Sequence, residues 1–130
     1  MNCGEKIIEL QILTDNICAV ARKEMSPLKM KVLFLVHEYG VITPKLLISK
    51  IGIAKSNLAA ICKILQKEEM IVAEKSIKNA RQIKYSLTSR GASVIKEIIS
   101  NINSVFRNSE QTSQMEFAFK ISADILNKKV

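Results

Sequence analysis

The stretch Thr43–Gly91, TPKLLISKIGIAKSNLAAICKILQKEEMIVAEKSIKNARQIKYSLTSRG, decides the fold that we expect for the whole chain. Its Thr-Pro start predicts a helix, because Thr caps an N-terminus and Pro fits the first helical position. Gly52 ends this helix, and a second helix opens at Ala54 or Lys55 and runs to about Glu69. Two helices joined by a short turn that contains Gly form a helix-turn-helix, whose second helix can enter a DNA major groove.

Two strands are expected after these helices. Residues Met70–Ile77 and Gln82–Thr88 alternate between apolar and polar side chains, which is the pattern of half-buried strands. The residues 78–81 between them form the turn, where Asn79 best tolerates a left-handed conformation. A hairpin in this position predicts the winged form of the helix-turn-helix.

The other residues predict helices whose apolar side chains recur at three- and four-residue steps. The first, fifth and last helices carry more apolar surface than one core uses, which indicates packing on a second chain. On the second helix of the motif, Leu58, Ile61 and Leu65 are expected to face the core. The expected helices outside the motif are Glu5–Lys23, Pro27–Tyr39, a fifth from about Leu87–Gly91 to Arg107, and, after a polar loop, Gln114–Lys128.

The fold class is therefore mostly α with a small β-hairpin. We expect one domain over 1–130, with a winged helix-turn-helix core over 27–91 and helical parts over 1–24 and 92–130. The net charge of +8 is concentrated on that core. From Gly40 to Arg90 there are ten Lys and Arg against three Glu, whereas a merely solvated Lys-rich surface would spread its charge. This concentration favours a polyanion as partner.

The hairpin and the turn after it carry a family resemblance. The tip reads Asn79-Ala80-Arg81, and the second strand ends in Leu87-Thr88-Ser89-Arg90-Gly91. This resembles the Asp-x-Arg wing tip and the Leu-Thr-x-x-Gly turn of the MarR family of winged-helix transcriptional regulators, with Asn79 in place of the acidic residue. The resemblance covers the DNA-binding half well and the helical ends more loosely.

The resemblance implies a sequence-specific regulator of double-stranded DNA, a repressor or alternatively an activator. It implies a homodimer that reads a pseudo-palindromic operator and dimerises through its first, fifth and sixth helices, so that 1–24 and 92–130 become the dimerisation part. It also implies a small-molecule effector bound between the dimer helices and the winged helix.

Ten residues are the expected DNA contacts. Lys55, Ser56 and Asn57 begin the second helix of the motif, and Asn pairs bidentately with adenine. The family often has a polar residue and Arg near Ala59 and Ala60, so readout there is expected from thymine methyl groups or DNA shape. Lysines neutralise phosphates, and the resemblance places Arg81 in the minor groove. The full set is Lys55, Ser56, Asn57, Ala60, Lys63, Lys67, Lys75, Lys78, Arg81 and Lys84.

Two alternatives stay open for these contacts. Ser56 and Asn57 are also residues that cap helices, and hairpin lysines also protect a strand edge from aggregation. The alternative function is a winged helix that binds a protein partner in a transcription or replication assembly. Such a module would need neither Arg81 nor the lysines around it.

The cysteines and the single histidine give no sign of catalysis. Cys3, Cys18 and Cys62 form no paired motif, so the sequence predicts no metal site, no disulfide framework and no cofactor. Some MarR relatives sense oxidants through an N-terminal cysteine, which makes Cys18 a candidate redox sensor, although burial is the ordinary role of such a residue. Cys62 is expected to be half-buried and Cys3 to lie in a frayed end. His37 lies in an apolar helix and no phosphate-binding glycine loop is present, so we expect no enzyme.

The N-terminus MNCGEKIIEL lacks the basic start and long apolar core of a signal peptide. No apolar run approaches the length that spans a membrane. We therefore expect a cytoplasmic protein with no membrane partner.

Overall fold

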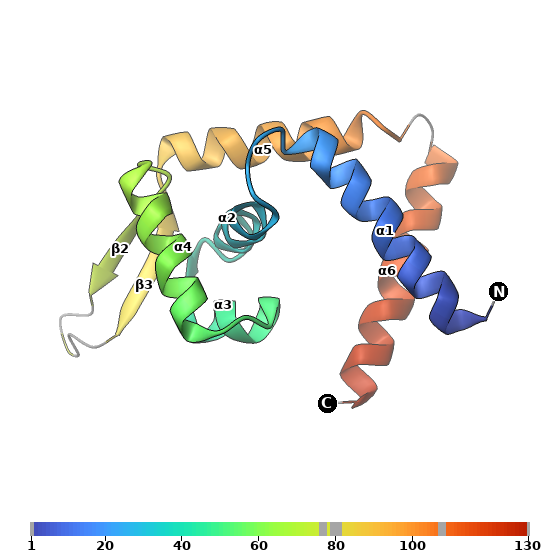
Figure 1. Cartoon of the computed structure of the whole chain (residues 1–130), viewed down its shortest axis with the longest axis horizontal. Coiled ribbons are helices and arrows are strands. Elements are labelled where there is room, and N and C mark those ends of the chain that lie inside the picture. The colour runs from blue at the N-terminus through green and yellow to red at the C-terminus, as the bar shows by residue number, and fades with distance from the viewer. Residues whose placement is uncertain (1, 76–77, 79–81, 107–108, 130) are drawn as a thin grey trace.

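The computed structural model describes residues 2–75, 78, 82–106 and 109–129. In this part of the chain, six helices accompany a small antiparallel sheet (Figure 1). The elements in order are α1 (Cys3–Ala21), α2 (Pro27–Tyr39), β1 (Val41–Ile42), α3 (Pro44–Ile51), α4 (Lys55–Lys67), β2 (Ile71–Lys75), β3 (Ile83–Leu87), α5 (Ser89–Asn103) and α6 (Ser109–Lys129). The expected class, mostly α with a small β-hairpin around a winged helix-turn-helix, is confirmed.

Local signals set the bounds of α2 and α3, which match the expected ranges. The side-chain oxygens of Ser26 and Thr43 accept hydrogen bonds from the backbone N–H groups of Lys29 and Leu46, at 3.2 and 3.3 Å. Each cap is followed by Pro at the first helical position. Gly52 ends α3 with φ of +78°, a left-handed conformation that Gly adopts without steric cost.

The sheet has one strand more than expected. Its strands lie in the order β1-β3-β2, and both pairings are antiparallel. The additional strand is β1, in which Val41 pairs with Ser86 of β3 and Ile42 pairs with Tyr85. Two residues are too few for an alternating pattern, so this strand depends on a partner distant in sequence and gives no local signal.

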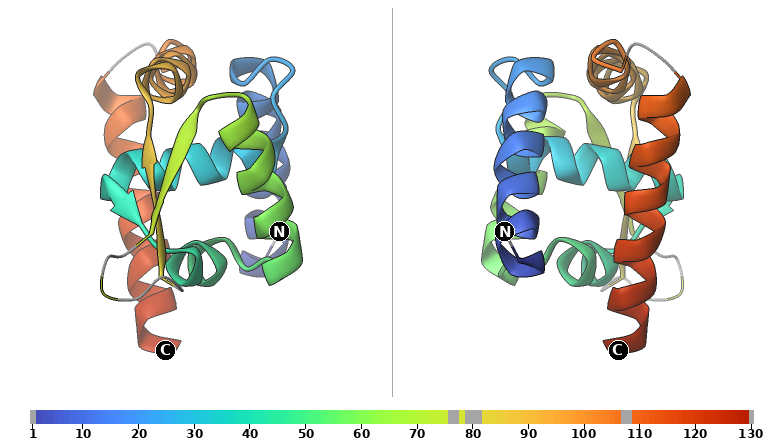
Figure 2. Two further views of the ribbon diagram at one scale, coloured as in Figure 1. Left: turned by 90° about the vertical axis from the view of Figure 1, so that its left-hand side faces the viewer. Right: turned by 90° about the vertical axis from the view of Figure 1, so that its right-hand side faces the viewer.

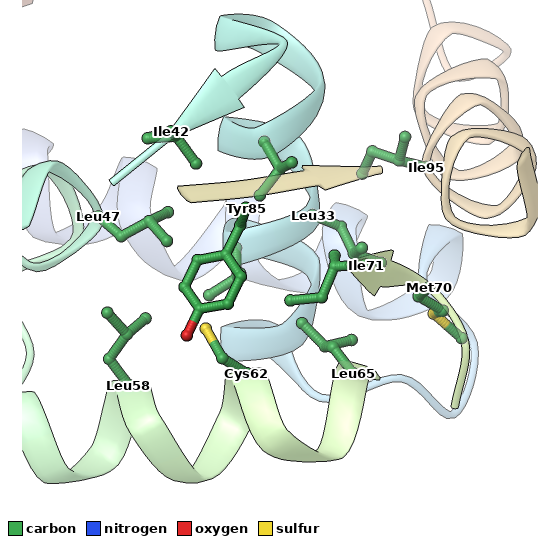
Figure 3. Close-up of a cluster of buried hydrophobic side chains, with 12 residues drawn as sticks. Leu33, Ile42, Leu47, Leu58, Cys62, Leu65, Met70, Ile71, Tyr85 and Ile95 are labelled. Atoms are coloured by element: carbon green, nitrogen blue, oxygen red, sulfur yellow. The ribbon is translucent and has the colours of Figure 1, made fainter. Parts of the chain in front are cut away.

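The hydrophobic core lies between α2, α4, α5 and the inner face of the sheet (Figure 3). From α4 the buried side chains are Leu58, Cys62 and Leu65. Ile61 packs against this core as expected but is only partly buried, whereas its neighbour Cys62 is fully buried. Cys62 is 1% exposed rather than half-buried. A thiol behaves as a small hydrophobe and fits this position.

Both ends of the chain are more helical than expected. The Asn2 side chain accepts a hydrogen bond from the Glu5 N–H at 2.9 Å, so Cys3 is the first residue of a capped helix rather than part of a frayed end. Helix α6 begins at Ser109, and most of the expected polar loop before Gln114 is helical. This segment contains neither Gly nor Pro, and its Glu and Gln residues are good helix formers.

Helices α1 and α6 bury little of their apolar surface on the rest of the chain. They extend away from the lobe formed by α2–α4 and the sheet (Figure 1), and Figure 2 shows them standing apart from each other. Val20 is 82% exposed and Phe119 is 73% exposed. Other exposed apolar side chains of the two helices are Ile7, Ile8, Leu10, Ile12, Leu13, Met115, Phe117, Ile121, Ile125 and Leu126.

Candidate nucleic-acid interface

Helix α4 turns one face to the core and the opposite face to solvent. Ser56, Ala60, Lys63 and Lys67 follow one another at steps of four, three and four residues, so they share one stripe along the helix. All four are exposed, as are Lys55 and the second alanine, Ala59. The helix contains no Asp or Glu. The stripe is therefore cationic toward its C-terminal half and uncharged in its middle.

The N-terminus of α4 has no side-chain cap. The N-cap residue is Ala54, whose backbone is extended, and no side chain bonds to the first backbone N–H groups. Ser56 and Asn57 lie inside the first turn with their side chains exposed, so the alternative that they cap the helix is wrong. Open N–H groups and the helix dipole make such an end suited to a phosphate.

The lysines of the wing do not form one cluster. Lys75 is the register partner of Ile83, and Lys84 is the partner of Glu74. Because successive residues of a strand point to opposite faces, Lys75 and Lys84 project from opposite sides of the hairpin. Lys78 is exposed, and Asn79, Ala80 and Arg81 lie outside the described residues. The DNA contacts expected from the sequence stay predictions, and only one face of the wing can place its lysine beside α4.

A backbone junction fixes the far end of α4 relative to α5. Glu69 follows α4 with φ of +61°, and its carbonyl accepts a 2.6 Å hydrogen bond from the Thr88 hydroxyl. The Thr88 N–H donates to the Met70 carbonyl at 3.0 Å, and the Gly91 N–H donates to the Thr88 hydroxyl oxygen at 3.0 Å. A Cβ on Gly91 would lie 2.0 Å from the Met70 carbonyl oxygen, so only Gly permits this approach. The Leu-Thr-x-x-Gly turn therefore joins α4, β3 and α5.

An ion pair holds the same end of α4 against α2. The Lys29 ammonium lies 2.5 Å from the Glu68 carboxylate, and both side chains are partly shielded from solvent. Together with the junction at Thr88, this contact fixes the direction in which the exposed stripe of α4 points.

A thiol and a phenol meet on the inner side of α4. Burial raises the pKa of the Cys62 thiol above its ordinary value. Burial, followed by the neighbouring Cys62, raises the pKa of the Tyr85 hydroxyl to about 12, and the two groups share a hydrogen bond (Figure 3). Both groups are therefore neutral near pH 7, as the centre of the core requires.

A hollow of about 410 Å³ lies between α2, the end of α3 and α5. Its walls are mostly apolar, with the cationic side chains of Lys31 and Lys50 and the amide of Asn103 among them. Such a mixture of apolar wall and few polar groups is typical of small-molecule sites. The lining residues are Met30, Lys31, Phe34, Leu35, Lys50, Ile51, Ile95, Ile98, Ile99, Ile102 and Asn103.

The described residues contain no other cluster of side chains arranged for catalysis or metal binding. Cys18 and His37 are each half-buried, on α1 and α2 respectively, and the redox role of Cys18 stays a prediction. No three His, Cys, Asp or Glu side chains of the described residues converge as metal ligands would. Over the same residues, no helix combines the length and apolar character needed to traverse a bilayer.

The arrangement of α3, α4 and the β2–β3 hairpin is that of a winged helix-turn-helix, with long helices added at both ends. Solved structures of MarR-family regulators share it. Wild-type MarR from E. coli, in its apo form, superposes with a TM-score of 0.77 at 14% identity, over 94% of this chain and 96% of that one. The transcriptional regulator Tm0710 from Thermotoga maritima gives 0.65 at 18% identity, over 96% and 94% of the two chains.

A third similar structure is BpsR from Bordetella bronchiseptica, whose DNA binding is regulated by 6-hydroxynicotinic acid. It gives a TM-score of 0.70 at 12% identity, over 93% of each chain. No protein-family model and no curated protein sequence matches the chain. At these identities the likeness establishes the fold: the chain has the fold of the MarR-family regulators, as the wing-tip and Leu-Thr-x-x-Gly residues indicated.

Three features of the site were not expected from the sequence. The uncapped start of α4 follows from Ala54 and was readable, because Ala is a poor N-cap. The exposure of Ile64 on α4, at 43%, was not readable, since an apolar residue on a helix is ordinarily assigned to the core. The junction at Thr88 needs the contact between segments 19 residues apart and has no local signature beyond the Leu-Thr-x-x-Gly turn.

Proposed function

We propose that the protein is a sequence-specific double-stranded DNA-binding transcriptional regulator, and that it represses by occupying its operator as a homodimer. The exposed stripe of α4 carries this proposal. It combines Lys63 and Lys67, an open helix N-terminus and no carboxylate, on a helix that the Thr88 junction and the Lys29–Glu68 ion pair hold in place. Phosphates neutralised by lysines supply most of the affinity of such a surface.

The homodimer is supported by the exposed apolar faces of α1 and α6. Val20, Phe119 and the other apolar side chains on these helices would form an exposed surface larger than monomeric proteins usually carry. A second copy that covers them by two-fold symmetry would also present two α4 helices to one duplex. Half-sites about one helical turn of DNA apart follow from that symmetry.

The proposal also includes regulation of DNA binding by a small molecule. The hollow beside Phe34 and Ile102 has the size and lining of a ligand site, and it contacts both α3 and α5. BpsR, which has the same fold, responds to 6-hydroxynicotinic acid. We propose that an apolar organic anion enters this hollow, where Lys31 and Lys50 would bind its charge. Such an anion should lower operator affinity in wild type, and Ile102→Trp, which fills the hollow, should abolish that response.

The test of the proposed function is selection of fragments from a random duplex pool by the purified protein, followed by anisotropy titrations. An inverted repeat bound by two chains per duplex is the expected result. Binding that ignores sequence, or a protein that sediments as a monomer at micromolar concentration, would contradict it.

The alternative, a winged helix that binds a protein partner, predicts a different response to charge. Lys63→Glu and Lys67→Glu would abolish duplex binding under the proposed function. Under the alternative, the protein would still bind a partner that it holds through apolar contacts, despite both substitutions.

A further inference from the structure

The middle of the exposed stripe of α4 is apolar. Ala60 lies at its centre, one turn after Ser56, and Ile64 lies one further turn along, beside Lys63. The side chain of Ile64 is 43% exposed, whereas Leu58, Cys62 and Leu65 of the same helix are at most 2% exposed. The exposure of Ile64 leaves an apolar group of two side chains on the surface, framed by Lys63 and Lys67.

The chemistry of DNA limits what two methyl-bearing side chains can recognise. In the major groove the edges of A, G and C present only hydrogen-bonding groups, and thymine alone adds an apolar group, its C5 methyl. Ala60 and Ile64 have no side-chain donor or acceptor. A small residue at the centre of the stripe also lets the helix backbone approach the floor of the groove closely.

We infer that Ala60 and Ile64 are specificity-determining residues that select thymines in each operator half-site through their C5 methyl groups. The inference rests on the proposed function. The flanking lysines decide between a duplex and a protein as the occupant of this face, because α4 has three lysines, counting Lys55 at its start, and no carboxylate. Such a frame matches the phosphate rows on both sides of a groove.

The division of labour along α4 follows. Asn57 and Ser56, near the N-terminus, would read hydrogen-bonding edges, and Lys63 and Lys67 would bind phosphates. Ala60 and Ile64 would set the thymine positions between them. Each operator half-site should therefore hold one or two thymines at which the C5 methyl group itself contributes to the binding affinity.

The experiment removes the methyl group from the DNA rather than from the protein. The duplex selected from the random pool is resynthesised with deoxyuridine in place of each thymine in turn, which deletes only the C5 methyl. Wild-type affinity is expected to fall about fourfold at one or two positions per half-site, as the burial of one methyl group implies. At the remaining thymines it should stay within about 1.5-fold.

A double-mutant cycle assigns the contact. Ile64→Ala, an exposed change that keeps a good helix former, should weaken binding of the thymine duplex and should remove the deoxyuridine penalty at one position. Val72→Ala is the control, because Val72 is exposed to a similar degree but lies on β2. It should leave every deoxyuridine penalty unchanged.

Three results would overturn the inference without overturning the proposed function. A tightly bound operator that tolerates deoxyuridine throughout would refute it and leave the proposed function standing. If the fold-losses from Ile64→Ala and from deoxyuridine are independent and simply multiply, the inference is also refuted. It is refuted equally if Ile64→Ala has unchanged affinity for every duplex. Selection of no duplex at all would overturn the proposed function, and this inference with it.

Discussion

At the scale of the residue, the direction of α4 depends on a few positions with specific contacts. Gly91 is the clearest, because the Met70 carbonyl occupies the space of its missing Cβ. Thr88 is another: its hydroxyl accepts the Gly91 N–H and donates to Glu69, so one oxygen both caps α5 and holds the end of α4. Both residues fix the direction of α4, so under the proposed function they affect DNA binding only through that helix.

Gly91→Ala is expected to destabilise the fold by about 3 kcal/mol, because the Cβ would displace the backbone at Met70. Urea denaturation at a fixed protein concentration measures this loss. Gly4→Ala is the matched control. Its Cβ would lie 3.4 Å from the Asn2 side chain, so the same change should stabilise α1 by about 0.5–1 kcal/mol. Equal effects at the two glycines would contradict the account of the junction.

The buried Tyr85 predicts a loss of stability in alkali. Its pKa is about 12 in the folded chain and 10 when free, so the unfolded state ionises first. The resulting stability is complete below pH 10 and is lost as the pH rises from 10 to 12. Tyr85→Phe should therefore lose less stability than wild type between pH 9 and pH 11, in urea titrations at both values. Parallel losses would show that the hydroxyl is not buried as described.

At the scale of the element, α4 is both the helix that carries the proposed DNA contacts and a helix whose N-terminus lacks a side-chain cap. Ala54 has the extended backbone of an N-cap but no oxygen to bond the open N–H groups. A helix end kept open in this way is available to a phosphate. Stability and DNA affinity should therefore respond differently to a new cap.

Ala54→Asp is expected to stabilise the protein by about 1 kcal/mol by capping α4. It should also weaken operator binding by about tenfold, because a carboxylate would lie where a phosphate binds. Thermal denaturation and anisotropy titrations measure the two effects. Ala54→Ser supplies a cap without charge and should stabilise with less than about a threefold loss of affinity. The idea fails if Asp and Ser weaken binding equally.

At the scale of the whole molecule, the exposed apolar surfaces of α1 and α6 support the proposed homodimer. The double variant Ile12→Glu with Phe119→Glu should fold and sediment as a monomer at about 10 µM, because both side chains are exposed within one chain. Operator affinity should fall at least tenfold as the second half-site is lost. Val72→Glu, at an exposed position of the sheet, should remain a dimer. A double variant that still sediments as a dimer would place the interface elsewhere.

Much of the fold could be predicted from local chemistry, and less of the site. Helices α2 and α3 were delimited correctly, because Ser26 and Thr43 cap them, Pro follows, and Gly40 and Gly52 end them. Features that depend on distant contacts were missed. The strand β1 exists only beside β3, and the full burial of Cys62 depends on packing against segments distant in sequence.

The site shows the same division. The cationic character of α4 and the wing is a matter of composition and was read from the sequence. Which lysines share a face is a matter of register, and Lys75 and Lys84 proved to point apart. The exposure of Ile64 depends on how α4 packs as a whole, so no local pattern could show it.

The measurement that tests the central claim most directly is the salt dependence of operator binding. For the selected duplex, the logarithm of affinity against that of salt should have a slope of about −6 to −9, as roughly 6–10 phosphate contacts require. Lys63→Gln with Lys67→Gln should reduce its magnitude by about 2. Lys96→Gln with Lys120→Gln, which removes the same charge from α5 and α6, should leave the slope unchanged. Equal slopes for the two double variants would contradict the claim that the exposed stripe of α4 binds DNA.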